Sequence, residues 1–189
     1  KYMGASVKGG RFHSDVHDLW ISPKDNNFMY LATDGGLYIS YDKANAWNFC
    51  RNLPISQFYH VNVDNDKPYN VFGGLQDNGS WIAPSKSAGG ITNNDWDRVG
   101  WGDGFNVIRD PNDDNIMYWQ WQGGGTRRAY LDTRELKDIK PYSTDGTKLR
   151  FHWNTPMIIG ARSGKLYMGS QFVFVSDDHG NSWDQISND

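Results

Sequence analysis

The chain has 189 residues, which is enough for one domain with a hydrophobic core. Aromatic residues make up 15% of it, with nine Trp and ten Tyr, and there are 21 Gly, a composition that favours strands joined by tight turns over helices. The net charge of -3 provides no basic surface, which argues against a nucleic-acid partner.

Apolar runs are only a few residues long, so we expect no membrane span. Cys50 is the single cysteine, which excludes an internal disulfide and a cysteine-based zinc site. No signal peptide is visible, and the sequence opens at Lys1 rather than Met. We therefore expect a cloned domain, a processed product or a fragment of a longer protein.

Polar groups first gather in the stretch "RFHSDVHDLW", Arg11 to Trp20. In an extended chain His13, Asp15 and His17 share one face, and Asp18 points to the other. Such a trio is typical of a hydrogen-bonded start of a strand, of a ligand or catalytic site, or of a metal site. We interpret it as framework or ligand contact, and expect no metal and no cofactor.

One phrase recurs four times: a short strand, a polar turn, a second strand and a Gly-rich turn. The copies are "LWISPKDNNFMYLATDGGLYIS", "YHVNVDNDKPYNVFGGLQDNGSWIAPS", "FNVIRDPNDDNIMYWQWQGGGTRRAYL" and "PMIIGARSGKLYMGSQFVFVS". Tyr30, Val71, Tyr118 and Tyr167 recur at intervals of 41, 47 and 49 residues. A period of roughly 40 to 50 residues is typical of a four-stranded propeller blade.

The last copy runs on into the most specific motif of the chain. Its residues Ser176, Asp178, Gly180 and Trp183, with Ser182, match the Asp-box, a structural turn of many propellers. The Asp carboxylate is expected to accept backbone N–H bonds across the turn, and the Trp to pack between neighbouring sheets.

A second copy of this motif follows the first repeat, with Ser40, Asp42 and Trp47. Ala44 stands there where Gly is usual, so we expect a looser turn. The second and third repeats lack the motif. Their stretches "NNDWDRVG" and "LDTRELKDIKPYSTDGTKLR" are interpreted as longer polar connections.

The sequence thus predicts an all-β fold, a partial β-propeller of about four blades of four-stranded antiparallel sheets with Asp-box turns. Residues 1–189 form a single propeller segment, with blades at about 13–50, 57–99, 103–150 and 153–189. Four blades in an open array leave sheet faces and edges unpaired, so the remaining blades of the same protein are an expected partner.

The chain resembles a family of large bacterial BNR/Asp-box propeller proteins, often labelled glycosyl hydrolase or sortilin-like. The phrases "GRFHSDVHDLWISP", "DGGLYISYDKANAWNFCRNLPISQFYHVNVDNDKPYNVFGGLQDNGSW", "GDGFNVIRDP" and "LRFHWNTPMII" carry the resemblance. Relatives in fold include the sortilin propeller and the xyloglucanases. The resemblance implies a propeller, a secreted, periplasmic or surface location, and a carbohydrate partner, but no xyloglucanase catalytic motif matches positions here.

Blade topology predicts where a site lies. The connection into the first strand of a blade and the turn between its second and third strands open on the same face, which collects polar groups on one rim. The candidate ligand-binding residues of this rim are His13, His17, Gln57, His60, Gln76, Asn78, Trp101, Gln122 and Asn154, with the indoles of Trp119, Trp121 and Trp153 beside them. Aromatic faces mixed with amides and carboxylates are typical of sugar sites.

Asp15, Asp77 and Asp103 are the candidate catalytic residues, because glycosidases use two carboxyl groups roughly 5 to 9.5 Å apart. Purely structural interpretations are also open. The stretches "TDGG" and "QDNGS" are typical of turns, and the glycines around Asp103 admit either a ligand or another backbone. The leading hypothesis is an extracytoplasmic carbohydrate-active propeller, with glycoside hydrolysis as one form. The alternative is a sortilin-like, non-catalytic propeller that binds a protein ligand.

Overall fold

The fold is all-β, as predicted. A computed structural model describes residues 6–7, 10–53 and 55–189 and contains four four-stranded antiparallel sheets of a partial β-propeller. The chain divides into two compact units, Lys1–Ser56 (unit 1) and Gln57–Asp189 (unit 2). Among the described residues, no helix is long and apolar enough to cross a membrane.

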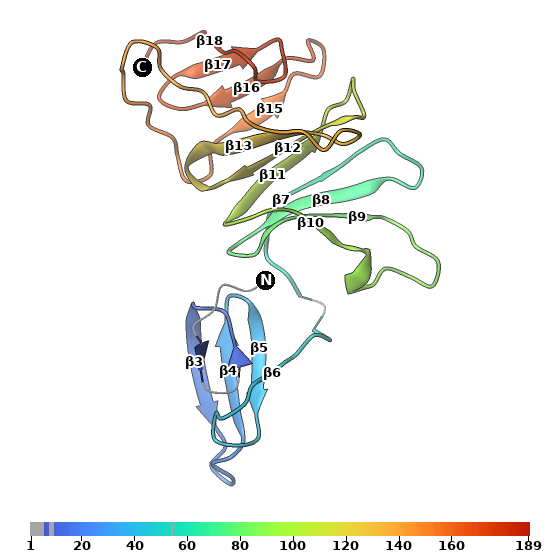
Figure 1. Ribbon diagram of the computed structural model, residues 1–189, viewed down its shortest axis with the longest axis vertical. Helices are drawn as coiled ribbons and strands as arrows, with labels where there is room; N and C mark the ends of the chain where they lie inside the picture. Colours follow the sequence, from blue (N-terminus) through green and yellow to red (C-terminus); the bar gives the residue numbers. More distant parts are fainter. Residues whose placement is uncertain (1–5, 8–9, 54) are drawn as a thin grey trace. The chain divides into compact units, whose positions relative to one another are not determined.

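Unit 1 contains one of the four sheets, with its strands in chain order from one edge to the other (Figure 1). Leu31 and Tyr38 are its buried hydrophobic residues, 5% and 2% exposed. A short two-stranded pair, β1 (Ser6–Val7) and β2 (Gly10–Arg11), precedes the sheet. The strands of the sheet are β3 (Val16–Ile21), β4 (Met29–Thr33), β5 (Gly36–Ser40) and β6 (Asn48–Phe49).

Unit 2 contains the other three sheets, each with its first strand at one edge and its fourth strand at the other. The second sheet has β7 (Phe58–Val63), β8 (Asn70–Leu75), β9 (Gly79–Pro84) and β10 (Asp97–Gly100). The third has β11 (Gly104–Arg109), β12 (Ile116–Trp121), β13 (Gly125–Tyr130) and β14 (Leu136–Asp138). The fourth has β15 (Met157–Ile159), β16 (Leu166–Gly169), β17 (Val173–Ser176) and β18 (Asp184–Gln185). Two short 3-10 helices, η1 (Asn93–Asp95) and η2 (Gln122–Gly124), lie in connections.

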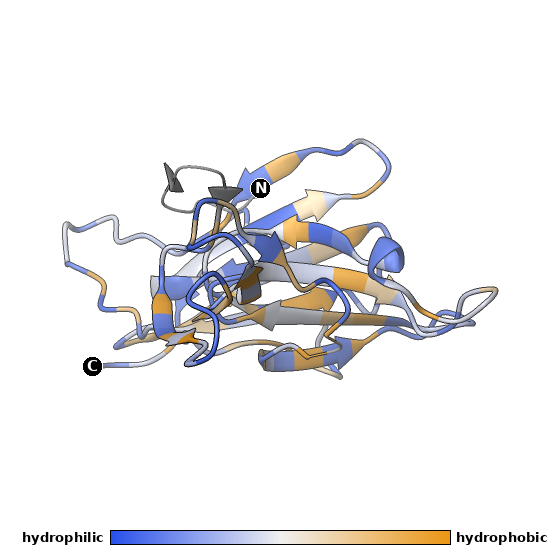
Figure 2. Ribbon diagram, turned by 90° about the horizontal axis from the view of Figure 1, so that it is seen from below, coloured by the Kyte–Doolittle hydropathy of each residue, from blue (hydrophilic) through white to orange (hydrophobic). Residues whose placement is uncertain are grey.

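The core of unit 2 lies between consecutive sheets, because a small sheet can bury its faces only against a neighbour. Phe72 of β8 packs with Val107, Met117, Trp119 and Ala129 of the third sheet. Figure 2 shows apolar residues recurring along the strands, with mostly hydrophilic connections between them.

A second apolar cluster joins the third sheet to the fourth. It contains Ile116 and Tyr118 of β12, Ile139 just after β14, Met157 of β15 and Leu166 of β16. The Tyr118 hydroxyl donates to the buried Asp110 carboxylate at 3.1 Å. Desolvation, together with the Asp110 charge, raises the pKa of Tyr118, so the phenol stays neutral.

The first strands of the second and third sheets are joined along their length. The rings of Tyr59 and Phe105 lie 4.6 Å apart, and the Asn62 side chain donates to the Val107 carbonyl at 2.9 Å. At the far end, Arg109 Nη1 lies 3.0 Å from a carboxylate oxygen of Asp64, whose side chain is 5% exposed. These contacts fix the third sheet against the second.

Two stretches expected to be connections contain the fourth strands of their sheets. β10 includes Asp97 to Gly100 of "NNDWDRVG", and β14 includes Leu136 to Asp138 of "TRELKDIK". All three residues of β14 are exposed, so the strand has none of the alternation that would mark it in the sequence. The prediction of a loop over 136–138 is therefore wrong.

The two Ser-x-Asp turns have nearly the same hydrogen bonds. The Ser176 hydroxyl accepts the Gly180 N–H at 2.8 Å and the Asp178 carboxylate accepts the Ser182 N–H at 2.9 Å. In the first copy Ser40 accepts from Ala44 and Asp42 accepts from Ala46, each at 2.9 Å. The prediction of a looser turn is therefore wrong, because both hydrogen bonds are kept. The backbone of Ala44 is strained instead, since its φ of 65° is unfavourable for a residue with a side chain.

We predict that Ala44→Gly stabilises unit 1 by about 1 kcal/mol, because it removes the cost of a side chain at positive φ while keeping both hydrogen bonds. Ala46→Gly is the matched control in the same turn, and there the added backbone entropy destabilises the fold by about 0.5 kcal/mol. Urea unfolding of both variants measures the difference. A stability loss at both positions would contradict the strain assigned to Ala44.

A second prediction concerns acid stability. Desolvation opposes ionisation of Asp64, but hydrogen bonds from Asn70 and Arg109 outweigh it and lower the pKa of Asp64 below 3.8. A lowered folded-state pKa adds stability that is present above about 3.8 and is lost as the pH falls through the folded value. Asp64→Asn should cost about 2 kcal/mol at neutral pH and make the acid dependence of unfolding shallower. Asp66 is more exposed, so Asp66→Asn should lower the stability less. Equal losses of stability in the two variants would contradict the role assigned to Asp64.

Candidate functional site

Within unit 2, the predicted rim is joined by hydrogen bonds between loops of three sheets. We call it the tip network: the turn between β8 and β9, the connection from β10 to β11, the helix η2 and the segment before β15. Gln122 lies in η2, and Trp153 precedes β15. Sequence positions up to 94 residues apart are in direct contact here.

Asp103 is the central residue of the tip network. Its side-chain Oδ1 accepts the Asp77 N–H at 2.9 Å, and its own N–H donates to Gln122 Oε1 at 3.0 Å. Asp103 is 7% exposed. Its carboxylate is therefore an anchor for the turn between β8 and β9.

Gly104 explains why the backbones come so close. A Cβ at this position would lie 2.2 Å from the carbonyl oxygen of Gly79, so only glycine fits. The adjacent Gly102 carbonyl accepts the Gly79 N–H at 2.8 Å. The glycines around Asp103 were expected to admit either a ligand or another backbone, and in the structure another backbone approaches them.

The fourth sheet joins the network through the segment before β15. The Trp153 carbonyl accepts the Gly123 N–H at 3.0 Å, and His60 Nε2 lies 3.1 Å from Asn154 Oδ1. His60 belongs to β7, so this contact links the second sheet with the segment that leads into the fourth. Three predicted rim residues of unit 2, His60, Gln122 and Asn154, are thereby brought into one framework.

The remaining rim candidates of unit 2 are arranged around the turn between β8 and β9. The Gln57 carbonyl accepts the Gln76 N–H at 3.2 Å, and the Asn78 amide donates to the Gln76 carbonyl at 2.9 Å. Asp77 has a φ of 58° at the tip of this turn. Gln57 itself is exposed.

Asp15 lies in unit 1, whereas Asp77 and Asp103 lie in unit 2. Of the three candidate acids, only the last two therefore belong to one compact unit. His13, Asp15 and His17 are grouped with Asp34, through contacts of His13 with Asp15 and of His17 with the Asp34 carboxylate. Asp34 comes from the turn between β4 and β5. Alternation within one segment does not include it, whereas blade topology predicted it on the same face.

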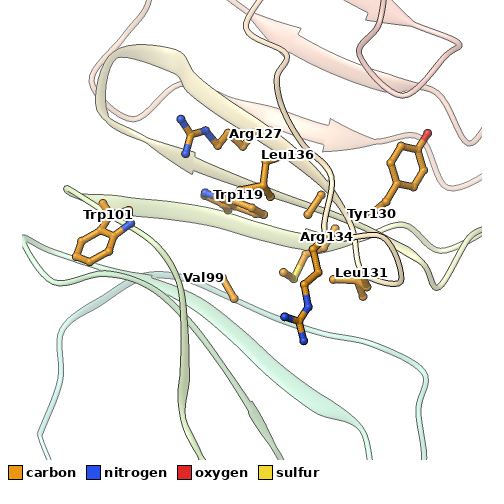
Figure 3. A pocket seen from close by; sticks show the side chains of 10 residues that line it. Val99, Trp101, Trp119, Arg127, Tyr130, Leu131, Arg134 and Leu136 are labelled. Atoms are coloured by element: carbon orange, nitrogen blue, oxygen red, sulfur yellow. The ribbon is translucent and has the colours of Figure 1, made fainter. Parts of the chain in front are cut away.

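A pocket of about 270 Å³ lies beside the tip network, between β10 and the third sheet. Trp101, Trp119 and Tyr130 give it aromatic walls, and Arg127 and Arg134 bring guanidinium groups, as Figure 3 shows. Aliphatic side chains of β10, β12 and the β13 to β14 region complete the lining. The two indoles were predicted to lie on the rim, whereas the two arginines were not.

Trp101 is both exposed and held in place. Its side chain is 60% exposed, and the Arg98 guanidinium carbon lies 4.0 Å from the centroid of its ring. Arg98 Nε also donates to the Gly100 carbonyl at 3.1 Å. The cation over one ring face holds Trp101 as an exposed aromatic surface in the lining of the pocket.

Arg127 is positioned in the same way. Its guanidinium carbon lies 5.5 Å from the Trp121 ring centroid, and its Nε contacts an Asp138 carboxylate oxygen at 2.7 Å. The Arg134 backbone has a φ of 60° in the turn between β13 and β14. The pocket can thus offer aromatic surface and fixed N–H donors to one ligand.

The chain matches no protein-family model and no curated protein sequence. Its fold is similar to an ancestral GH74 enzyme, at 13% identity with a TM-score of 0.48 over 98% of this chain and 26% of that one. It is also similar to the GH74 xyloglucanase from Xanthomonas campestris, at 14% identity with a TM-score of 0.48 over 92% of this chain and 30% of that one. The Swd1 β-propeller domain from Myceliophteria thermophila has 9% identity and a TM-score of 0.46, over 95% and 63%. The chain spans 26% and 30% of the length of the two GH74 enzymes.

We predict that Asp103→Ala destabilises unit 2 by about 2 kcal/mol, because the Asp77 N–H loses its acceptor in a buried place. Asp97→Ala, an exposed carboxylate of β10, should change stability by less than about 0.5 kcal/mol. Urea unfolding measures both. An Asp103 variant as stable as the parent chain would contradict the anchoring role.

Proposed function

We propose that the chain is the glycan-binding part of an extracytoplasmic β-propeller and binds saccharide at the pocket beside Trp101. The observation that carries the proposal is the exposed Trp101 ring, with Arg98 against one face, in the lining of a pocket that also includes Trp119 and Tyr130. Pyranose rings have apolar C–H faces that stack on such surfaces, and their hydroxyl groups accept hydrogen bonds from guanidinium N–H groups.

The proposal favours binding over hydrolysis. A general acid must present its carboxyl group to the substrate. The Asp103 carboxylate instead accepts the Asp77 N–H and anchors the turn between β8 and β9.

Trp101→Ala is the direct test. We expect it to weaken polysaccharide binding roughly thirtyfold, since a central Trp contributes about 2 kcal/mol at a binding site. Trp101→Phe, which keeps an aromatic face, should retain most of the affinity. Trp20→Ala removes another exposed indole, from unit 1, and should have no effect.

The measurement is calorimetric titration of the full chain with β-glucan, xyloglucan and sialoside ligands found on a glycan array. Reducing-sugar release is assayed in parallel with Asp77→Asn and Asp103→Asn. If the parent chain releases reducing sugar, and both substitutions abolish that release but leave binding intact, the site is catalytic and the proposal of binding alone is wrong. No glycan bound on the array would overturn the proposal and favour a protein ligand.

A further inference from the structure

Three potential metal ligands meet at one end of the unit 1 sheet. His13, Asp15 and Asp34 each offer a nitrogen or oxygen atom, and these atoms all lie within 4.8 Å of one another. We call this group the His13 cluster. It shares no residue with the glycan pocket and is independent of the proposed function.

Backbone pairing holds the two carboxylate-bearing residues side by side. Val16 pairs with Thr33 at the end of β3 and β4, and the Asp34 N–H donates to the Asp15 carbonyl at 3.1 Å. The register shifts between Val16 and Asp18, so simple alternation does not continue through His17. Bulges of this kind re-aim side chains, often next to functional sites.

His13 is fixed from two sides. It is 8% exposed, and a Cβ on Gly35 would lie 2.7 Å from the His13 Cβ, so the turn can close over the imidazole only with glycine. The Asp15 N–H lies 3.3 Å from His13 Nδ1, and the Asp15 carboxylate lies 3.5 Å from the same nitrogen. The imidazole is thus oriented toward the carboxylates.

The electrostatics of the cluster favour a cation. Asp15 and Asp34 bring two carboxylates together, and their repulsion is relieved by a positive charge between them. His17 Nε2 contacts the Asp34 carboxylate from an exposed position. A hydrogen bond from outside the ligand set is the usual way in which a metal-binding carboxylate is oriented.

We propose that His13, Asp15 and Asp34 bind a divalent transition-metal ion, Zn²⁺ or Mn²⁺, and that His17 positions the Asp34 carboxylate. One imidazole with two carboxylates suits these borderline ions better than Ca²⁺ or Mg²⁺, which take oxygen ligands. Ligands about 2.1 Å from an ion lie at most about 4.2 Å apart, so a small movement of a side chain closes the site. The side chain of Asp15, 58% exposed, can make it. This inference revises the sequence-based expectation of a site without metal.

The ion would tie the segment before β3 to the turn between β4 and β5. Because it binds the folded unit, it should raise the thermal unfolding temperature of the chain, by an amount that grows with the logarithm of the ratio of free ion concentration to Kd. Three protein ligands leave coordination positions for water, as in open metal sites.

Calorimetric titration of the full chain, freed of metal with EDTA, with ZnCl₂ and separately with MnCl₂ tests the proposal. We expect one ion per chain at micromolar affinity or tighter, with CaCl₂ much weaker. Asp15→Asn and Asp34→Asn should each weaken binding by more than tenfold, and His17→Gln by about tenfold. Asp15→His, which exchanges one ligand type for another at an exposed position, should retain binding.

Asp18→Asn is the matched control, because Asp18 lies in the same segment but outside the cluster; it should bind as the parent chain does. The exposed Asp15 variants keep the test valid if substitution of the buried His13 prevents folding. Mn²⁺ should broaden the NMR signals of residues 13–17 and 33–36 selectively. No binding by the parent chain, unchanged binding by Asp15→Asn and Asp34→Asn, or equal weakening by Asp18→Asn would overturn the proposal.

Discussion

Each four-stranded sheet in this chain is too small to bury its own faces, so the fold depends on packing of one sheet against the next. In unit 2 this packing is carried by Phe72 against the third sheet and by Tyr118 against the fourth. Their exposed fractions, 0% and 1%, place them among the most deeply buried side chains. Every functional feature of unit 2 is a consequence of these two interfaces, because both the tip network and the pocket combine residues of adjacent sheets.

Close packing of the sheets also decides what their polar tips can do. Where Gly104 lies against Gly79, the two backbones are in direct contact, and the Gly79 N–H donates to the Gly102 carbonyl. The neighbouring N–H groups of Asp77 and Asp103 donate to the side chains of Asp103 and Gln122. The polar side chains of the tip network are therefore occupied by contacts within the protein, whereas the Trp101 ring beside them is exposed.

The sequence predicted the features that depend on local patterns. The repeat period located the sheets, and the first strands lie where "YHVNV" and "FNVIR" placed them. The outer strand β14 was not predicted, because all of its residues are exposed. The pocket was not predicted for another reason. Val99 and Arg127 come from different sheets, and no spacing within the sequence indicates that they lie close together.

The His13 cluster shows how far local reasoning reaches. Alternation brought out His13, Asp15 and His17, and blade topology placed Asp34 on the same face. Their direct contact depends on the hairpin, because Asp34 lies 17 residues from His17. Two carboxylates near an imidazole have a different chemistry from one, because the second negative charge strengthens the attraction for a cation. Gly35, interpreted from the sequence only as part of a turn, is also the residue that lets His13 reach the group. The same residues can therefore form a turn and offer a ligand, and the hairpin register determines which other side chains they meet.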